Sequence, residues 1–273
     1  VEKGRVFSYT SLEVDAGDSV HMAYGGEQLY YALYDGSAWT HQEVERGGVG
    51  AYCSLSLDSY GTPAISYYDA VNGDLKYAYR DGPLNDVWGT SASNVFAVGG
   101  SGTIMHWDGS VWSPMVSNTG QTLYDVWGTS PTSIFAVGDN GVILRYNGSS
   151  WSHMASGSSQ SLRGVWAAAS DNVYAVGTNG AILHYDGLSW SPMSSPTPND
   201  LRAVWGASAT DIFAVGDSGT ILRYNGGSWL TMSSGTSRWL ADVWGTSGSN
   251  VYAVGENGAI LHYDGASWSN STV

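Results

Sequence analysis

The stretch "DVWGTSPTSIFAVGDNGVILRYNGSSW" at residues 125–151 holds one copy of a repeat that runs through most of this chain. Each copy keeps one order: a Val-Trp pair, the pattern "(V/I)(F/Y)AVG", a Gly-flanked turn, the pattern "I(M/L)(H/R)(W/Y)(D/N)G", and a second Trp. Successive copies are 39 residues apart, and their opening pairs start at Val87, Val126, Val165, Val204 and Val243. Repetition at a fixed period of this length is the signature of a repeat architecture.

The chain before this series uses a second repeat type. Residues 1–15, "VEKGRVFSYTSLEVD", match residues 44–58, "VERGGVGAYCSLSLD", at an offset of 43 residues. Both types contain three apolar runs and an Asp-Gly or Asn-Gly pair before a fourth run. Because the repetition is uninterrupted, we expect a single domain over residues 1–273, with two repeats of about 43 residues in 1–82 and five of 39 residues in 83–273.

The apolar runs predict short β-strands. "SIFAVG" at residues 133–138 and "GVILRY" at 141–146 are rich in β-branched and aromatic residues and are bounded by turn-forming residues. No apolar stripe has helical spacing, and the 37 Gly residues argue against long helices. The pairs Asn147-Gly148 and Asp186-Gly187 suit two-residue hairpin turns. Each repeat is therefore expected to form a four-stranded antiparallel meander.

A sheet with these runs has two apolar faces, and a neighbour must cover each of them. Radial sheets cover one another in a β-propeller, which suits a repeat of about 40 residues. A linear solenoid is the alternative, but no polar capping repeat is present. First strands are expected near residues 11, 54, 86, 125, 164, 203 and 242. The sequence thus predicts an all-β fold, a seven-bladed β-propeller of four-stranded antiparallel blades.

The second blade is an exception to this plan. Only four residues separate Gly82 from Val87, which leaves no room for a fourth strand, and Pro83 ends any continuation of the third. We expect this blade to have three strands, with residues 75–80 as an exposed edge. Such an edge can support self-association by strand addition.

Charged residues are sparse, at 12% of the chain, and the formal net charge is −14 with only two Lys. Nucleic-acid and anionic membrane surfaces need clustered Lys and Arg, so we expect neither partner. No apolar span reaches 18 residues, so no membrane insertion is expected, and Cys53 is the single Cys. No cofactor is expected. Low Lys with abundant Gly, Ser and Trp is typical of secreted bacterial repeat proteins, so we expect a secreted or cell-surface protein.

These motifs resemble those of bacterial β-propeller repeat proteins. The 39-residue repeats are distantly similar to Asp-box (BNR) and photosystem II assembly-factor-like propellers. Residues 54–82, "SLSLDSYGTPAISYYDAVNGDLKYAYRDG", resemble another bacterial propeller repeat, so the chain looks like a fusion of two types. Propellers include lectins, hydrolases, lyases and scaffolds, so the resemblance implies the fold and leaves the function open.

The Asp-box resemblance departs from the family pattern at one point. An Asp-box has a spacer between its Asp and its Gly, whereas "YDGLSW" at residues 185–190 has none. The resemblance still implies that Asp186 caps the turn and that Trp190 packs between blades.

Most residues that could carry chemistry recur in every repeat, which favours a structural role. Two of the Trp positions recur in each 39-residue repeat and are expected to pack between blades, whereas Trp107 and Trp239 break the pattern and are better ligand candidates. The alternating third-strand residues are expected at the seams between blades, too far apart for one metal ion: His106, Arg145, His184, Arg223 and His262. No acid–base pair or activated nucleophile stands out, so no catalytic residue is assigned.

The most informative position lies just before each first strand. In order it reads Asn85, Tyr124, Arg163, Arg202 and Ala241. In a propeller, side chains at this position converge at the mouth of the central channel. The candidate ligand-binding residues are therefore Tyr124, Arg163, Arg202, Trp239, Asp125 and Asp242. Such a set suits an anionic or polyhydroxylated ligand, for example an acidic sugar; the alternative is solvated Arg paired with Asp at the rim.

Three functions are compatible with the sequence. We favour a non-catalytic propeller that binds a glycan or protein ligand at the channel mouth on its top face. The alternatives are a ligand-free structural or engineered repeat scaffold, and a carbohydrate-active enzyme, a hydrolase or lyase. Ionisable groups with strongly perturbed pKa values in a top-face pocket would favour the enzyme, and an apolar or wet channel the scaffold.

Overall fold

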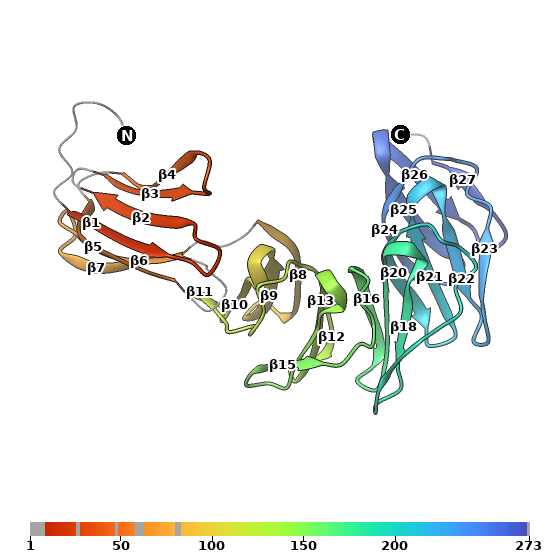
Figure 1. Ribbon diagram of the computed structural model, residues 1–273. Coiled ribbons are helices and arrows are strands. Elements are labelled where there is room, and N and C mark those ends of the chain that lie inside the picture. Colours follow the sequence, from red (N-terminus) through yellow and green to blue (C-terminus); the bar gives the residue numbers. More distant parts are fainter. Residues whose placement is uncertain (1–8, 26–27, 47–48, 58–62, 80–82, 272–273) are drawn as a thin grey trace. The chain divides into compact units, whose positions relative to one another are not determined.

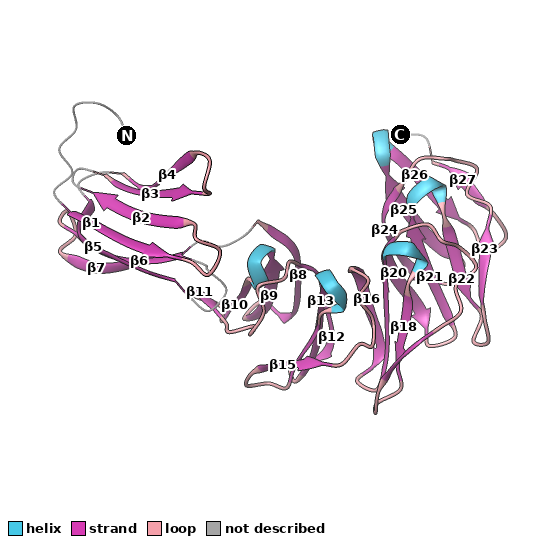
Figure 2. Ribbon diagram, viewed as in Figure 1, coloured by secondary structure: helices cyan, strands magenta, loops and turns pink. Residues whose placement is uncertain are grey.

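The structure, a computed structural model, describes residues 9–25, 28–46, 49–57, 63–79 and 83–271. In these residues the chain forms seven antiparallel sheets, six of four strands and one of three, and the only helices are five 3-10 turns of three residues each (Figure 1). Strands dominate both compact units into which the chain divides, Val1–Asp81 (unit 1) and Gly82–Val273 (unit 2) (Figure 2). The predicted fold class, a seven-bladed β-propeller with one three-stranded blade, is confirmed.

Unit 1 holds two sheets, with the strand orders β1-β2-β3-β4 and β5-β6-β7. Their strands are β1 Tyr9–Val14, β2 Val20–Gly25, β3 Leu29–Tyr34, β4 Trp39–Glu45, β5 Val49–Leu57, β6 Pro63–Asp69 and β7 Asp74–Tyr79. Apolar side chains of both sheets, including Ala23, Leu29, Leu55 and Ile65, form one buried cluster. The second sheet has no fourth strand within the described residues, so β7 is an edge, as the short Gly82–Val87 spacing predicts.

Unit 2 holds five four-stranded meanders built on one plan. The first strands are β8 Leu84–Ser91, β12 Leu123–Ser130, β16 Leu162–Ala169, β20 Leu201–Ser208 and β24 Leu240–Ser247. The second strands are β9 Asn94–Gly99, β13 Ser133–Gly138, β17 Asn172–Gly177, β21 Asp211–Gly216 and β25 Asn250–Gly255. The 3-10 turns that follow are η1 Gly100–Gly102, η2 Asp139–Gly141, η3 Thr178–Gly180, η4 Asp217–Gly219 and η5 Glu256–Gly258.

The outer strands of unit 2 complete each meander. The third strands are β10 Ile104–Trp107, β14 Ile143–Tyr146, β18 Ile182–Tyr185, β22 Ile221–Tyr224 and β26 Ala259–Tyr263. The fourth strands are β11 Trp112–Pro114, β15 Trp151–Met154, β19 Trp190–Pro192, β23 Trp229–Met232 and β27 Trp268–Asn270. In each sheet the fourth strand is no longer than the third and shorter than the first two, so the sheet narrows away from its first strand.

The turns depend on a few residues with special backbone conformation or side-chain capping. In the predicted tight turn at residues 138–141, Asn140 and Gly141 have φ values of 54° and 71°. Asn tolerates this left-handed conformation better than most residues, and Gly adopts it without steric cost.

The hairpins between third and fourth strands differ from the two-residue turns that the sequence predicts. Four residues separate β14 from β15, and Oδ1 of Asn147 accepts hydrogen bonds from the backbone N of Ser149 and Ser150 at 2.9 and 3.0 Å. Asp186 caps the equivalent loop in the same way, as the Asp-box resemblance implies. The two-residue prediction is wrong because a capping side chain needs two further amides to bind.

Trp residues join neighbouring sheets of unit 2. A Cβ added at Gly128 would lie 2.6 Å from the Trp88 ring, and one added at Gly206 would lie 2.5 Å from the Trp166 ring. The missing side chain of each Gly thus makes room for the indole of the preceding sheet. The ring of Trp190 meets Phe135 of the preceding sheet edge-on at 6.3 Å. Most of these recurrent Trp residues therefore pack between blades, but Trp112 of the first sheet in unit 2 and Trp244 of the last are 45% and 57% exposed.

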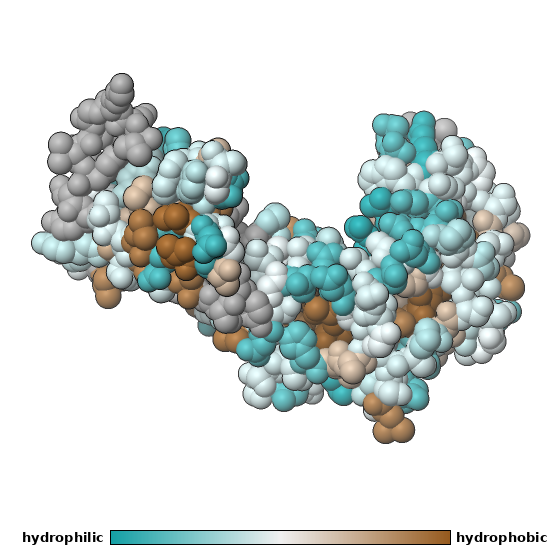
Figure 3. Space-filling view, in the orientation of Figure 1, coloured by the Kyte–Doolittle hydropathy of each residue, from teal (hydrophilic) through white to brown (hydrophobic). Residues whose placement is uncertain are grey.

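The surface reflects the sparse charge. Most of the visible surface has intermediate hydropathy, with scattered strongly polar and apolar areas (Figure 3). Among the described residues, no helix is long and apolar enough to cross a membrane. The boundary between the compact units lies one residue from the point where the two repeat types meet. A single domain over residues 1–273 stays a prediction.

Candidate functional site

Each first strand of unit 2 begins with a β-bulge at the variable position of the repeat. In β12, Leu123 pairs with Gly138 and Asp125 pairs with Val137, so Tyr124 is an extra residue in the ladder. The same shift isolates the equivalent residues of the other four strands, Asn85, Arg163, Arg202 and Ala241. A bulge bends the strand and re-aims its side chains, which interrupts the strict alternation of a regular strand.

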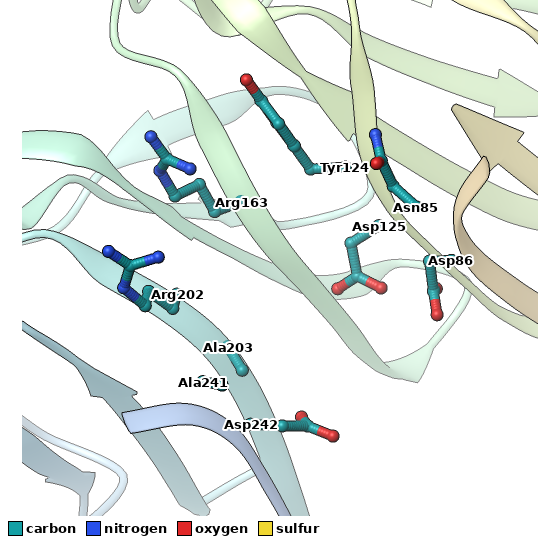
Figure 4. Close-up of a pocket in the computed structure, with 9 residues that line it drawn as sticks. All are labelled: Asn85, Asp86, Tyr124, Asp125, Arg163, Arg202, Ala203, Ala241 and Asp242. Atoms are coloured by element: carbon teal, nitrogen blue, oxygen red, sulfur yellow. The ribbon is translucent and has the colours of Figure 1, made fainter. Parts of the chain in front are cut away.

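These bulges gather side chains from all five first strands around one pocket of about 360 Å³ (Figure 4). Its lining is Asn85, Asp86, Tyr124, Asp125, Arg163, Arg202, Ala203, Ala241 and Asp242. Four strands contribute two successive residues, which a regular strand would direct to opposite faces. The volume lies at the lower end of the range for ligand pockets, roughly 300–1,000 Å³.

Arg202 has a carboxylate partner outside the pocket lining. Its Nε donates a hydrogen bond to Oδ1 of Asp217 in η4 at 2.5 Å, and its guanidinium lies 4.9 Å from the centre of the Trp239 ring. Both members of the ion pair are about one-third exposed. The charge of Arg202 is therefore largely balanced within the protein.

Arg163 stands in the equivalent position of the preceding sheet without such a partner. Its guanidinium lies 5.2 Å from the centre of the Tyr124 ring, and its buried Nε has no hydrogen-bond acceptor among the described residues. The residue equivalent to Asp217 is Thr178, whose hydroxyl donates to Oε1 of Gln160 at 3.1 Å. Within the described part of the chain, Arg163 is thus a cation of the pocket with no ion-pair partner.

The carboxyl groups of the pocket join neighbouring sheets. Oδ2 of Asp86 accepts a hydrogen bond from the backbone N of Val126 at 3.0 Å, and Oδ2 of Asp125 accepts one from Val165 at 2.7 Å. Enclosure by the surrounding strands raises the pKa of Asp125 well above its usual range, and the adjacent Asp86 carboxyl raises it further by hydrogen bonding and charge. Desolvation, with a smaller contribution from Asp86, also raises the pKa of Asp242.

The third-strand His and Arg residues lie away from this pocket. His106, for example, hydrogen-bonds through Nε2 to Oδ1 of Asn94 at 2.7 Å. Arg223 donates to Oδ1 of Asp211 at 2.7 Å and to the hydroxyl of Tyr263 in the next sheet at 3.0 Å. The Arg223–Tyr263 contact crosses the seam between two sheets, whereas the His106–Asn94 and Arg223–Asp211 contacts lie within one sheet. No group of His, Cys, Asp and Glu among the described residues could hold a metal ion.

Five of the six candidate residues line the pocket: Tyr124, Asp125, Arg163, Arg202 and Asp242. Trp239 does not line it; its ring lies against Arg202. The other Trp candidate, Trp107, donates from Nε1 to the carbonyl of Ala92 at 3.0 Å. The alternative of an Arg paired with a rim Asp describes Arg202, but its partner is the turn residue Asp217, which the sequence reasoning missed. Asp217 lies in the stretch "GDSG" at residues 216–219, which by its sequence indicates only a polar turn.

Comparisons with known proteins identify the fold. No family model and no curated protein matches the chain. Among solved structures, YCF48 bound to D1 peptide matches with 13% identity and a TM-score of 0.54, over 94% of this chain and 91% of that one. YCF48 from Cyanidioschyzon merolae matches with 12% identity and a TM-score of 0.53, over 93% and 94%. The C-terminal WD40 domain of Sif2 matches with 12% identity and a TM-score of 0.55, over 90% and 78%. At these identities the likeness shows the β-propeller fold alone.

Proposed function

We propose that this protein is a non-catalytic binding module that holds an anionic group of a partner protein in the pocket of unit 2. The observation that carries the proposal is Arg163, whose buried Nε has no acceptor among the described residues. A buried donor without a partner costs about 1–3 kcal/mol, and more when it is charged. A ligand carboxylate could pair with the accessible part of the guanidinium through a charge-assisted hydrogen bond, because no carboxylate of the described residues balances the charge of Arg163.

The aromatic rings favour a protein ligand over a glycan. Stacking of a sugar needs an open ring face, and the guanidinium groups of Arg163 and Arg202 already lie over Tyr124 and Trp239. The similar structure of YCF48 is bound to a D1 peptide, which supports a peptide ligand for a propeller of this kind. A glycan ligand is the outcome to exclude by experiment.

The raised pKa of Asp125 is a feature that would favour an enzyme. Both of its carboxyl oxygens, however, accept backbone hydrogen bonds, from Val126 at 2.9 Å and from Val165 at 2.7 Å. The Val165 contact holds β12 against β16, and both contacts orient the carboxyl toward the backbone. We therefore assign Asp125 a structural role and propose no catalytic step.

The proposal is tested on parallel arrays of capped peptides of graded acidity and of glycans. We expect acidic peptides to bind, with affinity that falls as salt rises, and Arg163→Gln to abolish binding. Arg202→Gln should weaken binding less, because Asp217 already balances the charge of Arg202. The matched control is Arg238→Gln, which removes the same charge from an exposed residue outside the pocket lining. The proposal would be contradicted if Arg163→Gln bound acidic peptides as well as the wild type does, or if only glycans bound.

A second candidate function is strand addition at the open edge of unit 1. Leu75 on β7 is 79% exposed, while the neighbouring Lys76 is held by Glu45 and Asp69 at 2.8 Å each. An open strand edge with an exposed apolar side chain can accept another strand, including that of a second copy. We expect concentration-dependent association in sedimentation velocity that Leu75→Lys abolishes. A wild-type monomer at every concentration would exclude self-association.

A further inference from the structure

We infer that the ligand group recognised by this pocket is zwitterionic, with a carboxylate bound at Arg163 and an ammonium bound at the carboxyl groups of Asp86 and Asp242. The inference rests on the proposed function and adds the chemical class of the ligand. It follows from how the charges of the lining are distributed and from which of them are balanced.

The pocket separates its charges. In Figure 4 the guanidinium groups of Arg163 and Arg202 extend to one side of the view, and the carboxyl groups of Asp86, Asp125 and Asp242 lie on the other. The charge of Arg202 is balanced by Asp217, so Arg163 is the cation available to a ligand. The lining thus offers one free positive group opposite a group of acids.

The acidic side also has free capacity. None of its three carboxyl groups forms an ion pair with Lys, Arg or His within the described residues. Asp242 accepts at Oδ1 from the backbone N of Val243, and Asp86 accepts at Oδ2 from Val126, so each retains further lone pairs. Acids gathered in one pocket repel one another when ionised, and a ligand ammonium would relieve that repulsion.

A ligand whose charges all have the same sign would be attracted by one side of the pocket and repelled by the other. A dianion would bring its second charge toward the acids, and a dication would bring one toward Arg163. Like charges placed together reject a wrong partner as effectively as opposite charges attract the right one. The distribution therefore selects a ligand with opposite charges at its two ends, either a small molecule or neighbouring acidic and Lys side chains of a protein.

The test uses four five-carbon compounds that differ only in their end groups: 5-aminopentanoate, glutarate, pentanoate and 1,5-diaminopentane. Binding to the full chain is followed by NMR chemical-shift titration at low salt. We expect 5-aminopentanoate to bind about tenfold more tightly than the other three, a difference of about 1.4 kcal/mol. Capped dipeptides Glu-Lys, Glu-Gln and Gln-Lys repeat the comparison with protein side chains, and a preference for Glu-Lys alone would identify a protein source.

Two variants separate the ends of the ligand. Arg163→Gln should remove binding of 5-aminopentanoate, whereas Asp242→Asn should reduce it to the level of pentanoate and leave pentanoate itself unchanged. Arg238→Gln should change neither. Equal binding of glutarate and 5-aminopentanoate through Arg163 would overturn this inference and leave the proposed function standing. Lack of binding by all the compounds and dipeptides would overturn the inference, and failure of acidic peptides as well would overturn both.

Discussion

Arg202 and Asp217 form an ion pair, with 2.5 Å between Nε and Oδ1, that links the start of β20 to the η4 turn. In the preceding sheet the same two positions hold Arg163 and Thr178, and the pair is lost. One residue in a turn thus decides whether an arginine of the pocket is balanced by the protein or available to a ligand. This difference supports the first prediction.

Replacing Thr178 by Asp should supply Arg163 with the carboxylate that Arg202 has. The new carboxylate would compete with the ligand, so we expect Thr178→Asp to lower the affinity for acidic peptides about tenfold or more. Fluorescence anisotropy with a labelled acidic peptide measures the effect. Thr178→Asn is the control, because Asn has the size of Asp but carries no charge. Equal affinities of Thr178→Asp and the wild type would show that Arg163 does not hold the anion.

Replacing Asp125 by Asn should change how stability depends on pH. Because the pKa of Asp125 is raised in the folded state, the unfolded chain releases this proton first as the pH rises above about 4. The stability that the protonated group contributes is therefore lost progressively toward its raised pKa. Asp125→Asn keeps an uncharged side chain at every pH. Its free energy of unfolding should therefore increase relative to that of the wild type as the pH rises.

Urea denaturation between about pH 2 and pH 8 measures this difference, because this range also includes the titration of groups whose pKa lies below about 4. Asp186→Asn is a control of opposite sign, because backbone hydrogen bonds from Ser189 and Leu188 lower the pKa of Asp186. Asp186 stabilises the fold above its unfolded pKa. The free energy of unfolding of Asp186→Asn should therefore fall relative to that of the wild type as the pH rises. A stability difference between Asp125→Asn and the wild type that does not vary with pH would contradict the assignment of a raised pKa.

Replacing Ser133 by Asp should stabilise unit 2. Ser133 is buried with its Oγ unpartnered among the described residues, and it occupies the position from which Asp211 pairs with Arg223. An Asp here would face Arg145, and we expect a gain of about 1 kcal/mol in the free energy of unfolding, since the pair would be partly exposed. A double-mutant cycle with Arg145→Gln checks the mechanism. A gain that persists in the Arg145→Gln background would rule out the ion pair as its source.

Replacing Gly206 by Ala should destabilise the seam between two sheets. The new Cβ would lie 2.5 Å from the Trp166 ring, so the indole or β20 must shift. Overpacking of this kind costs about 1–3 kcal/mol. Gly227→Ala is the matched control, because its nearest neighbour is Oδ1 of Asn225 at 3.6 Å, and its effect should stay within about 0.5 kcal/mol. Thermal unfolding compares the two; equal melting temperatures would mean that the ring has room to move.

The sequence predicted the fold because each repeat carries its own strand and turn signals. The recurring "FAVG" segments and the Asn140-Gly141 turn act locally, within a few residues, so their meaning does not depend on the rest of the chain. The short spacing between Gly82 and Val87 likewise predicted the three-stranded sheet by length alone. The loop at Asn147 was misjudged because a side-chain cap and a two-residue turn start from the same Asn-Gly pair.

The sequence by itself determined the strands, their order, the number of sheets and the variable positions expected to converge in space. Only the tertiary structure decided which of these residues share a pocket, because the bulge at Tyr124 lets Tyr124 and Asp125 face the same space against strand alternation. It also decided that Asp217 pairs with Arg202 and that Arg163 lacks such a partner. Pairing of charges depends on distances between segments far apart in sequence, and only the folded chain sets those distances.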